Sequence, residues 1–256
     1  MVTTHAPSVV AKIRRILDAL ADGGVLGLSE LARRSGLAKP TVHRLCAELV
    51  AWGVVERAGD AFRLGPKLFE LGARVPGRRH LREAALPFVE DLFVATGHTV
   101  HLAVLDGLEV IYLERLTGRR FSPAPSSVAD RLPLHCTATG KCLLAFGPPE
   151  LLDEVIAGGL AARTSRSITD GEALASELDR VRRDGTATEL GEVSDGHVAV
   201  GAPIFELGHR IAGALSVTGH EGSVDLEQVR VLVRLTAGAL SRRLGASTLP
   251  VPAALA

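Results

Sequence analysis

The side chains with the clearest capacity for chemistry lie between positions 39 and 48. If this segment is a helix, its outer face is small, polar or basic. It carries Pro40, Thr41, Arg44, Ala47 and Glu48, with Lys39 and His43 at its edges. Arginine, lysine and threonine side chains hydrogen-bond to base edges and phosphates in DNA grooves. The pattern predicts a helix that enters the major groove, with Thr41 and Arg44 nearest the bases and Lys39 on phosphate or base.

The elements that would position this face form a helix-turn-helix. The apolar residues recur at i, i+3, i+4 and i+7, which predicts a stripe facing a core: Val42, Leu45, Cys46 and Leu49. Pro40 is expected as the first helical residue, since it has no N–H to leave unpaired. A shorter helix before it is expected to begin at an N-cap, Ser29, and to end near Gly36. Two helices joined in this way are typical of DNA-binding modules.

Two short strands are predicted to follow, over 54–57 and 61–64, around a turn at Ala58-Gly59-Asp60. This hairpin would be the wing of a winged helix-turn-helix. Phosphate contacts are expected from Arg57 and Arg63 on the wing and from Arg33 and Arg34 in the first helix. The alternative is a small helical subdomain whose surface hairpin touches no DNA.

The charge distribution favours nucleic-acid binding by one part of the chain only. The net charge of the 256 residues is zero, yet residues 1–80 hold 13 Lys and Arg against 7 Asp and Glu. The remainder has the opposite excess, which suits a basic DNA-binding domain on an acidic second domain. No run of about 18 apolar residues is present, and the first residues lack the pattern of a signal peptide. We therefore expect a cytoplasmic protein with no membrane segment.

The rest of the chain predicts an α+β domain with an antiparallel sheet. An N-terminal helix over 9–20 should pack under the helix-turn-helix, and residues 66–80 should form a linker with a short helix. Then follow helices and strands with a capping box at Thr169–Glu172 and a loop over 117–131. The expected helices are 81–96, 141–146, one from Pro148, one ending near Asp184 and 225–244; the expected strands are 98–105, 109–115, 186–193, 197–206 and 210–220. The domains are thus 1–65, the linker 66–80, and 81–246, with a disordered tail over 247–256.

Catalytic motifs are not evident. The segment before Lys141 resembles a phosphate-binding loop, but that motif needs Gly at 135, where His stands, and Ser or Thr at 142, where Cys stands. Cys136 beside His135 could suggest a thiol nucleophile or a metal site. Adjacent residues on a strand point to opposite faces, however, and no second cysteine pair exists. We expect no catalytic residue, no metal and no cofactor.

Several separated stretches resemble the IclR family of bacterial transcriptional regulators, in the order in which the family has them. They are LARRSGLAKPTVHRLCAELVAWGVVER, FRLGPKLFELG, LPLHCTATGKCLLA, GEVSDGHVAVGAPIFE and ALSVTGHEG. The resemblance implies a GAF-like effector-binding domain, a homodimer or homotetramer, and a palindromic operator in double-stranded DNA. It also implies a small-molecule effector, a small organic or aromatic acid. Whether the protein represses or activates stays open.

The resemblance also implies an effector pocket in the second domain. Its floor would be Ala138 and Thr139, and its walls and neighbours would be Glu189, Glu192, His197, Ala199, Ser216 and Thr218. Backbone N–H groups at the start of a helix after this Gly/Thr turn would suit a carboxylate. Against this, Glu189 would oppose an anion unless it is protonated or turned away. The alternative reading is that Ser216 and Thr218 are ordinary strand hydroxyls and that the second domain serves only oligomerisation.

Overall fold

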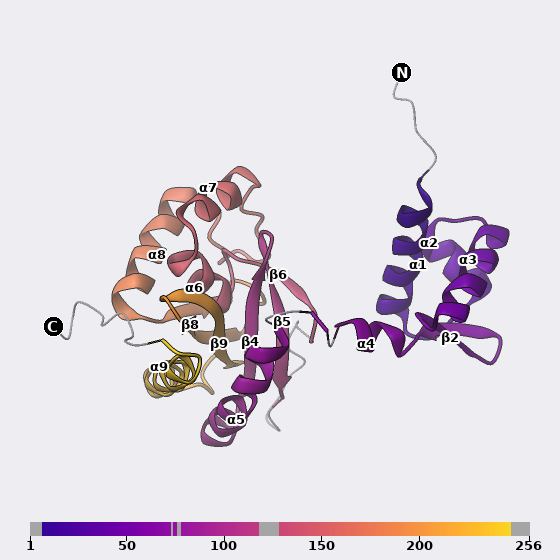
Figure 1. The fold of residues 1–256 in the computed structure, drawn as a ribbon. Coiled ribbons are helices and arrows are strands. Elements are labelled where there is room, and N and C mark those ends of the chain that lie inside the picture. The colour runs from indigo at the N-terminus through magenta and orange to yellow at the C-terminus, as the bar shows by residue number, and fades with distance from the viewer. Residues whose placement is uncertain (1–6, 73, 76–77, 118–127, 247–256) are drawn as a thin grey trace. The chain divides into compact units, whose positions relative to one another are not determined.

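The computed structural model describes residues 7–246 except 73, 76–77 and 118–127, so the predicted tail and most of the predicted 117–131 loop lie outside the described residues. The chain divides into two compact units, Met1–Arg79 and His80–Ala256. Each unit has its own core. Figure 1 shows the elements of both.

The first unit is a winged helix-turn-helix. Its helices are α1 (Val9–Gly23), α2 (Leu28–Ser35) and α3 (Lys39–Trp52), and its strands are β1 (Leu26–Gly27), β2 (Val55–Ala58) and β3 (Ala61–Leu64). The strands form one antiparallel sheet in the order β1-β3-β2. The predicted stripe of α3 is fully buried against α1 and Phe62 of the wing. A short helix, α4 (Lys67–Gly72), follows the wing.

Two local expectations in this unit are wrong. Gly27 occupies the N-cap position of α2, and Ser29 is the second residue of that helix. The reason is β1, which sequence reasoning missed: Leu26 and Gly27 pair with β3, and the helix begins directly after this pairing. The N-cap of α3 is Ala38, so Pro40 is the second helical residue, where it still has no helical N–H bond to lose.

The second unit is a six-stranded antiparallel sheet with helices on both faces. Its strand order is β6-β5-β4-β9-β8-β7. The strands are β4 (Thr99–Asp106), β5 (Glu109–Leu116), β6 (Arg131–Pro133), β7 (Ala187–Leu190), β8 (His197–Glu206) and β9 (Arg210–His220). The helices α5 (Arg78–Thr96) and α9 (Leu226–Arg243) cover one face (Figure 1). The helices α6 (Ala138–Phe146), α7 (Pro149–Ala157) and α8 (Gly171–Asp184) cover the other. The predicted α+β class is confirmed.

The predicted boundaries shift where caps and pairing decide them. α8 is capped by the Asp170 carboxylate, which accepts the N–H of Ala173 at 2.8 Å, and not by Thr169. α6 begins at Ala138, three residues earlier than predicted, because the Thr137 hydroxyl caps it. α5 begins at Arg78, inside the predicted linker. β6 was not predicted, and β7 ends at Leu190, before the turn that leads to β8.

Glycines at two positions allow the start of α6 to approach β8 and the turn that precedes the helix. A Cβ on Gly201 of β8 would be 3.0 Å from the backbone carbonyl of Ala138. A Cβ on Gly140 would be 2.3 Å from the carbonyl oxygen of Leu134. Neither position has room for a side chain without backbone movement. The start of α6 is therefore pressed against the middle of β8.

We predict that residues 78–256 fold without the first unit, because this segment contains all of the second unit's core. The purified fragment should unfold cooperatively on heating and keep the far-UV circular dichroism of a mixed helix and sheet protein. A fragment that begins at Thr99 is the control. It lacks α5 and with it the core residues Leu81, Ala85, Val89 and Leu92, so it should fail to fold. Non-cooperative melting of the longer fragment would contradict the division into two units.

Candidate functional site

The outer face of α3 is exposed as the sequence predicted. Ala38, Lys39, Pro40, His43, Arg44, Ala47 and Glu48 are exposed, and Thr41 is half-buried. Lys39, His43 and Arg44 have no hydrogen-bond or ion-pair partner in the described part of the chain. Their donors are therefore free to bind a partner molecule.

The other predicted basic contacts already have partners. Arg33 and Arg34 both bind Glu30, with N···O distances of 2.5 Å and 2.7 Å. Hydrogen bonds from these two guanidinium groups lower the pKa of Glu30 to about 2. On the wing, Arg63 pairs with Glu56 at 2.8 Å.

The guanidinium of the remaining predicted wing contact, Arg57, lies 5.3 Å from the ring centre of Phe62. This is a cation–π arrangement, which leaves the N–H groups of the guanidinium available. Four of the predicted basic residues are thus held by their own unit, while three on α3 are not.

A cavity lies in the second unit where the start of α6 meets the sheet. Seven of the eight residues predicted for an effector pocket line it: Ala138, Thr139, Glu189, His197, Ala199, Ser216 and Thr218. Strand register brings them together, since Glu189 of β7 is opposite Ala199 of β8, which is opposite Thr218 of β9. The cavity volume is about 40 Å³, so a ligand with an aromatic ring would require its side chains to move apart.

The structure adds lining residues that sequence reasoning missed. They are His101, Tyr112, Leu132, Thr137, Val193 and Ser194. His101 of β4 is opposite Ser216 of β9. The strand order β4-β9-β8, which the sequence does not show, was needed to place His101 at the cavity. Burial lowers the pKa of His101 to about 3 and raises that of Tyr112 to about 12, so both rings are uncharged at neutral pH.

The floor of the cavity is the first turn of α6. Thr137 Oγ1 accepts the N–H of Gly140 at 3.0 Å. The N–H groups of Ala138 and Thr139 have no acceptor within the described residues, as first-turn donors of a helix commonly do not. Thr139 Oγ1 is buried without a hydrogen bond of good geometry. It nevertheless lies close to the phenol of Tyr112, where it limits the rise in the pKa of Tyr112. Unpaired donors and the positive end of the helix dipole thus meet at the cavity.

Glu189 is the buried carboxyl group of the cavity. Its Oε1 accepts the backbone N–H groups of Glu192 and Val193 at 2.5 Å and 3.1 Å. Oε2 accepts no hydrogen bond in the described part of the chain. Burial raises the pKa of this carboxyl to about 7, against the effect of those two N–H groups. Glu189 is therefore turned toward the 192–193 backbone and is only partly ionised at neutral pH.

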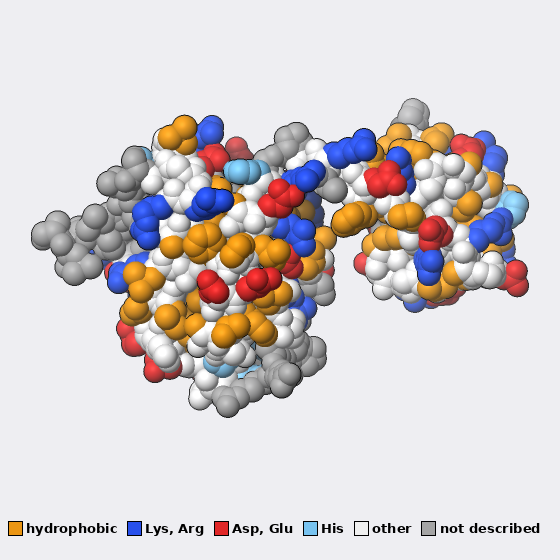
Figure 2. Space-filling view, turned by 60° about the horizontal axis from the view of Figure 1, so that its bottom comes forward, with side chains coloured by type: hydrophobic (Ala, Val, Ile, Leu, Met, Phe, Trp, Pro, Cys, Tyr) orange, Lys and Arg blue, Asp and Glu red, His pale blue; other side chains and the backbone are white. Residues whose placement is uncertain are grey.

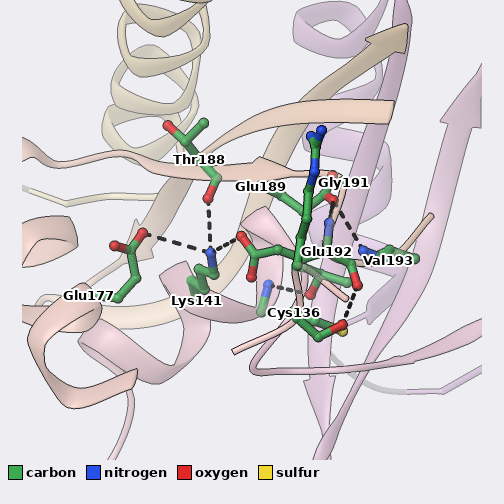
Figure 3. Close-up of polar contacts among 12 residues, drawn as sticks. Cys136, Lys141, Glu177, Thr188, Glu189, Gly191, Glu192 and Val193 are labelled. Atoms are coloured by element: carbon green, nitrogen blue, oxygen red, sulfur yellow. Dashed lines mark hydrogen bonds and ion pairs between the residues drawn. The ribbon is translucent and has the colours of Figure 1, made fainter. Parts of the chain in front are cut away.

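Glu192 does not line the cavity, which corrects its predicted place there. Its Oε1 binds the ammonium of Lys141 at 2.5 Å, behind the cavity floor. Lys141 is 1% exposed and also donates to the carbonyl of Thr188 at 3.0 Å, with Glu177 Oε1 at 3.7 Å. Figure 3 shows this ammonium between groups from α8, β7 and the loop after it. Glu192 thus supports the cavity from outside.

The location and contacts of the histidine and the cysteines decide between the thiol and metal chemistry considered from the sequence and a place in the packed interior. His135 and Cys136 lie in a turn and not on a strand, and His135 Nε2 is 3.1 Å from the carbonyl of Ala161. Burial raises the pKa of the Cys136 and Cys142 thiols to about 12, so neither forms a thiolate near neutral pH. Cys46 is buried in the first unit's core, as predicted. Among the described residues, no three His, Cys, Asp or Glu side chains are grouped as a metal site would need.

The helices that the structure describes include none with the length and apolar character to cross a bilayer.

Two family models match the chain. Residues 9–59 match the IclR helix-turn-helix domain, and residues 73–242 match the C-terminal domain of the bacterial transcriptional regulator IclR. The first match covers α1 to β2, the first strand of the wing, and the second covers nearly all of the second unit. Both of the units found in the structure therefore have a counterpart in the same family.

Curated relatives and solved structures agree with these models. The HTH-type transcriptional regulator XynR of Escherichia coli is 32% identical over 243 residues, which is 92% of this chain and 96% of XynR. The glycerol operon regulatory protein of Streptomyces griseus is 35% identical over 229 residues, 86% of this chain and 89% of that protein. An IclR homolog from Microbacterium hydrocarbonoxydans, solved with 4-hydroxybenzoate, has a TM-score of 0.85 at 32% identity and covers 94% of this chain and 100% of its own.

The exposed face of α3, the wing beside it and the polar cavity at the start of α6 occur together in one chain with this order of elements. Both family models and relatives of similar length match it throughout. The chain belongs to the IclR family of bacterial HTH-type transcriptional regulators.

Proposed function

We propose that the first unit binds a palindromic operator in double-stranded DNA through α3 and the wing, and that the cavity of the second unit binds the small molecule that controls this binding. Cytoplasmic location and action by binding rather than catalysis follow from the proposal. The observation that carries it is the cavity itself. Seven residues from β7, β8, β9 and α6 meet around unpaired backbone donors, which is what a binding site needs and a purely structural interface does not.

On the DNA side, we propose that Thr41 and Arg44 lie nearest the bases and that Lys39 and His43 bind bases or phosphates. Arg44 is exposed and has no protein partner in the described residues, so its guanidinium can bind a guanine without breaking an ion pair. Arg33, Arg34 and Arg63 would have to exchange a carboxylate for a phosphate. Arg57 keeps its N–H groups available while its guanidinium lies near Phe62. We therefore propose that α3 supplies specificity and that the wing and α2 add to affinity.

On the ligand side, we propose that the acid group of an effector binds at the N–H groups of Ala138 and Thr139. Ser216, Thr218 and His197 would supply hydrogen bonds to the rest of the molecule. A solved relative binds 4-hydroxybenzoate, and an aromatic acid of this size is the first probe to test here. Two copies of the chain are required to occupy the two halves of a palindrome, so we propose a homodimer or a homotetramer.

Ligand and DNA bind to separate units, so the ligand can act only by favouring one arrangement of the chain over another. The polypeptide path between the units is short: α4, the residues after it and α5. A change at the sheet can reach the DNA-binding unit through α5, because Arg82 of this helix binds Glu114 of β5 at 2.7 Å. We propose that α5 carries the signal between the units.

Arg44→Ala should weaken operator binding by about 1–3 kcal/mol, because a bidentate contact to a guanine is worth this amount. Fluorescence anisotropy with a duplex from the protein's own upstream region measures the change. The control is Arg243→Ala, an exposed arginine at the end of α9 in the second unit. Equal affinities of the Arg44 variant and the native chain would remove Arg44 from the interface.

Ser216→Ala should weaken the effector response and leave ligand-free DNA binding unchanged. The hydroxyl lines the cavity and its loss removes a hydrogen-bonding group worth about 0.5–1.5 kcal/mol. The matched control is Ser223→Ala, whose hydroxyl is exposed and binds the His220 carbonyl outside the cavity. Thermal shifts with a panel of small organic acids give the readout. If no member of the panel shifts the native chain, a domain that serves only assembly becomes the better account.

A further inference from the structure

The cavity presents an anionic ligand with an electrostatic problem. Its residues include a carboxyl group, Glu189, and the described residues that line it include no lysine or arginine. Lys141, whose charge acts on Glu189, does not line the cavity and is held by Glu192. A carboxylate bound at the N–H groups of Ala138 and Thr139 would thus share a small cavity with a second carboxyl group, without a lysine or arginine among the described lining residues to separate the two.

Two negative charges in a poorly solvated site repel strongly, and the usual solution is that one of them takes up a proton. We propose that the cavity binds a carboxylate effector together with one proton, which Glu189 accepts, and that it binds uncharged analogues without this requirement. This inference rests on the proposed function and specifies the charge state of the ligand site. The Oε2 atom of Glu189, which accepts no hydrogen bond from described residues, is the atom left to hold the proton.

The surroundings of Glu189 support this assignment. Burial already raises the pKa of its carboxyl to about 7, so a modest further effect from a bound anion protonates it at neutral pH. The titratable groups that face it are His101 of β4, Tyr112 of β5, His197 of β8 and Cys136 of the turn before α6; β9 contributes only the hydroxyls of Ser216 and Thr218. Lys141 and Glu192 act from behind the floor with opposite effects.

Most of these groups cannot take the proton themselves. His101 stays neutral because burial lowers its pKa to about 3. Burial raises the pKa of Tyr112 and of Cys136 to about 12, so both already hold their protons. His197 is the competing group by position, since it lines the cavity and its Nε2 is buried without a hydrogen-bond partner among the described residues. The experiment must therefore separate Glu189 from His197.

Calorimetric titration of the full chain provides the test, with 4-hydroxybenzoate and the uncharged 4-hydroxybenzamide as probes. Each is titrated between pH 5.5 and 8.5 in two buffers that differ in ionisation enthalpy, so that proton uptake is measured directly. For the acid we expect about one proton taken up above pH 7 and an affinity that falls about tenfold per pH unit there. For the amide we expect no uptake and a flat profile.

The variants assign the proton. Glu189→Gln should abolish the uptake and bind the acid about tenfold more tightly than the native chain at pH 8. His197→Gln should keep the uptake, and Glu206→Gln, which alters a carboxylate at the far end of β8, should behave like the native chain. Uptake that disappears in His197→Gln and persists in Glu189→Gln would overturn the proposal. Binding of the acid with a flat profile and no uptake would also overturn it, while leaving the proposed function standing.

Thermal melting gives a readout that needs no ligand. Because the folded chain favours protonated Glu189, this contribution to stability is complete below the usual carboxyl pKa of 4.5 and is lost as the pH rises through about 7. The melting temperature of the native chain should therefore fall relative to that of Glu189→Gln between pH 5 and 8. A constant difference would contradict the proposal. If neither probe binds any of the proteins, the proposed function fails and the inference fails with it.

Discussion

The buried ammonium of Lys141 is the constraint on which the cavity depends. A charge removed from water is costly unless it is paired and hydrogen-bonded, and removal of one partner of such a pair is strongly destabilising. Lys141 meets this demand with Glu192, the carbonyl of Thr188 and the more distant Glu177. These groups come from the loop after β7, from β7 itself and from α8. One ion therefore fixes the position of α6 relative to three other segments.

The position of the loop after β7 has direct consequences for the cavity. Because Lys141 holds Glu192, the backbone N–H groups of 192 and 193 are placed where Glu189 accepts them (Figure 3). The Ser167 and Thr164 hydroxyls bind the carbonyls of 192 and 191 from the other side. The cavity wall is thus built from a short loop with hydrogen bonds along most of its backbone. A ligand that moves this loop must also disturb the ion pair between Lys141 and Glu192. The residues of the loop are therefore expected to move together.

The surface of the second unit in Figure 2 carries hydrophobic side chains among charged ones. Val231 and Leu235 of α9 and Val94 of α5 are exposed on helices whose other faces form the core. The polar side chains of the cavity lie instead on the opposite face of the sheet, with α6. The cavity and the exposed apolar side chains of α5 and α9 therefore lie on opposite sides of the sheet.

The sequence by itself determined most of the fold. Helical periodicity in α3, a Gly-Asp turn in the wing and alternating β-formers around the Asp-Gly turn between β4 and β5 are local patterns. The elements that they predict are confirmed because each pattern lies within a few neighbouring residues. The sequence patterns also located the basic face of α3 and, through the family's motifs, most of the residues around the cavity. Their roles in binding stay predictions.

Only the tertiary structure decided which residues meet. β1 and β6 are short strands that exist because a partner strand pairs with them, and no local pattern marks such strands. His101 and Tyr112 joined the cavity, and Glu192 left it, because strand order and a buried lysine 51 residues away in the sequence place them. The protonation state of the Glu189 carboxyl was likewise open until its burial was known. A side chain's charge depends on the polarity of what surrounds it, and that is set by residues distant in sequence.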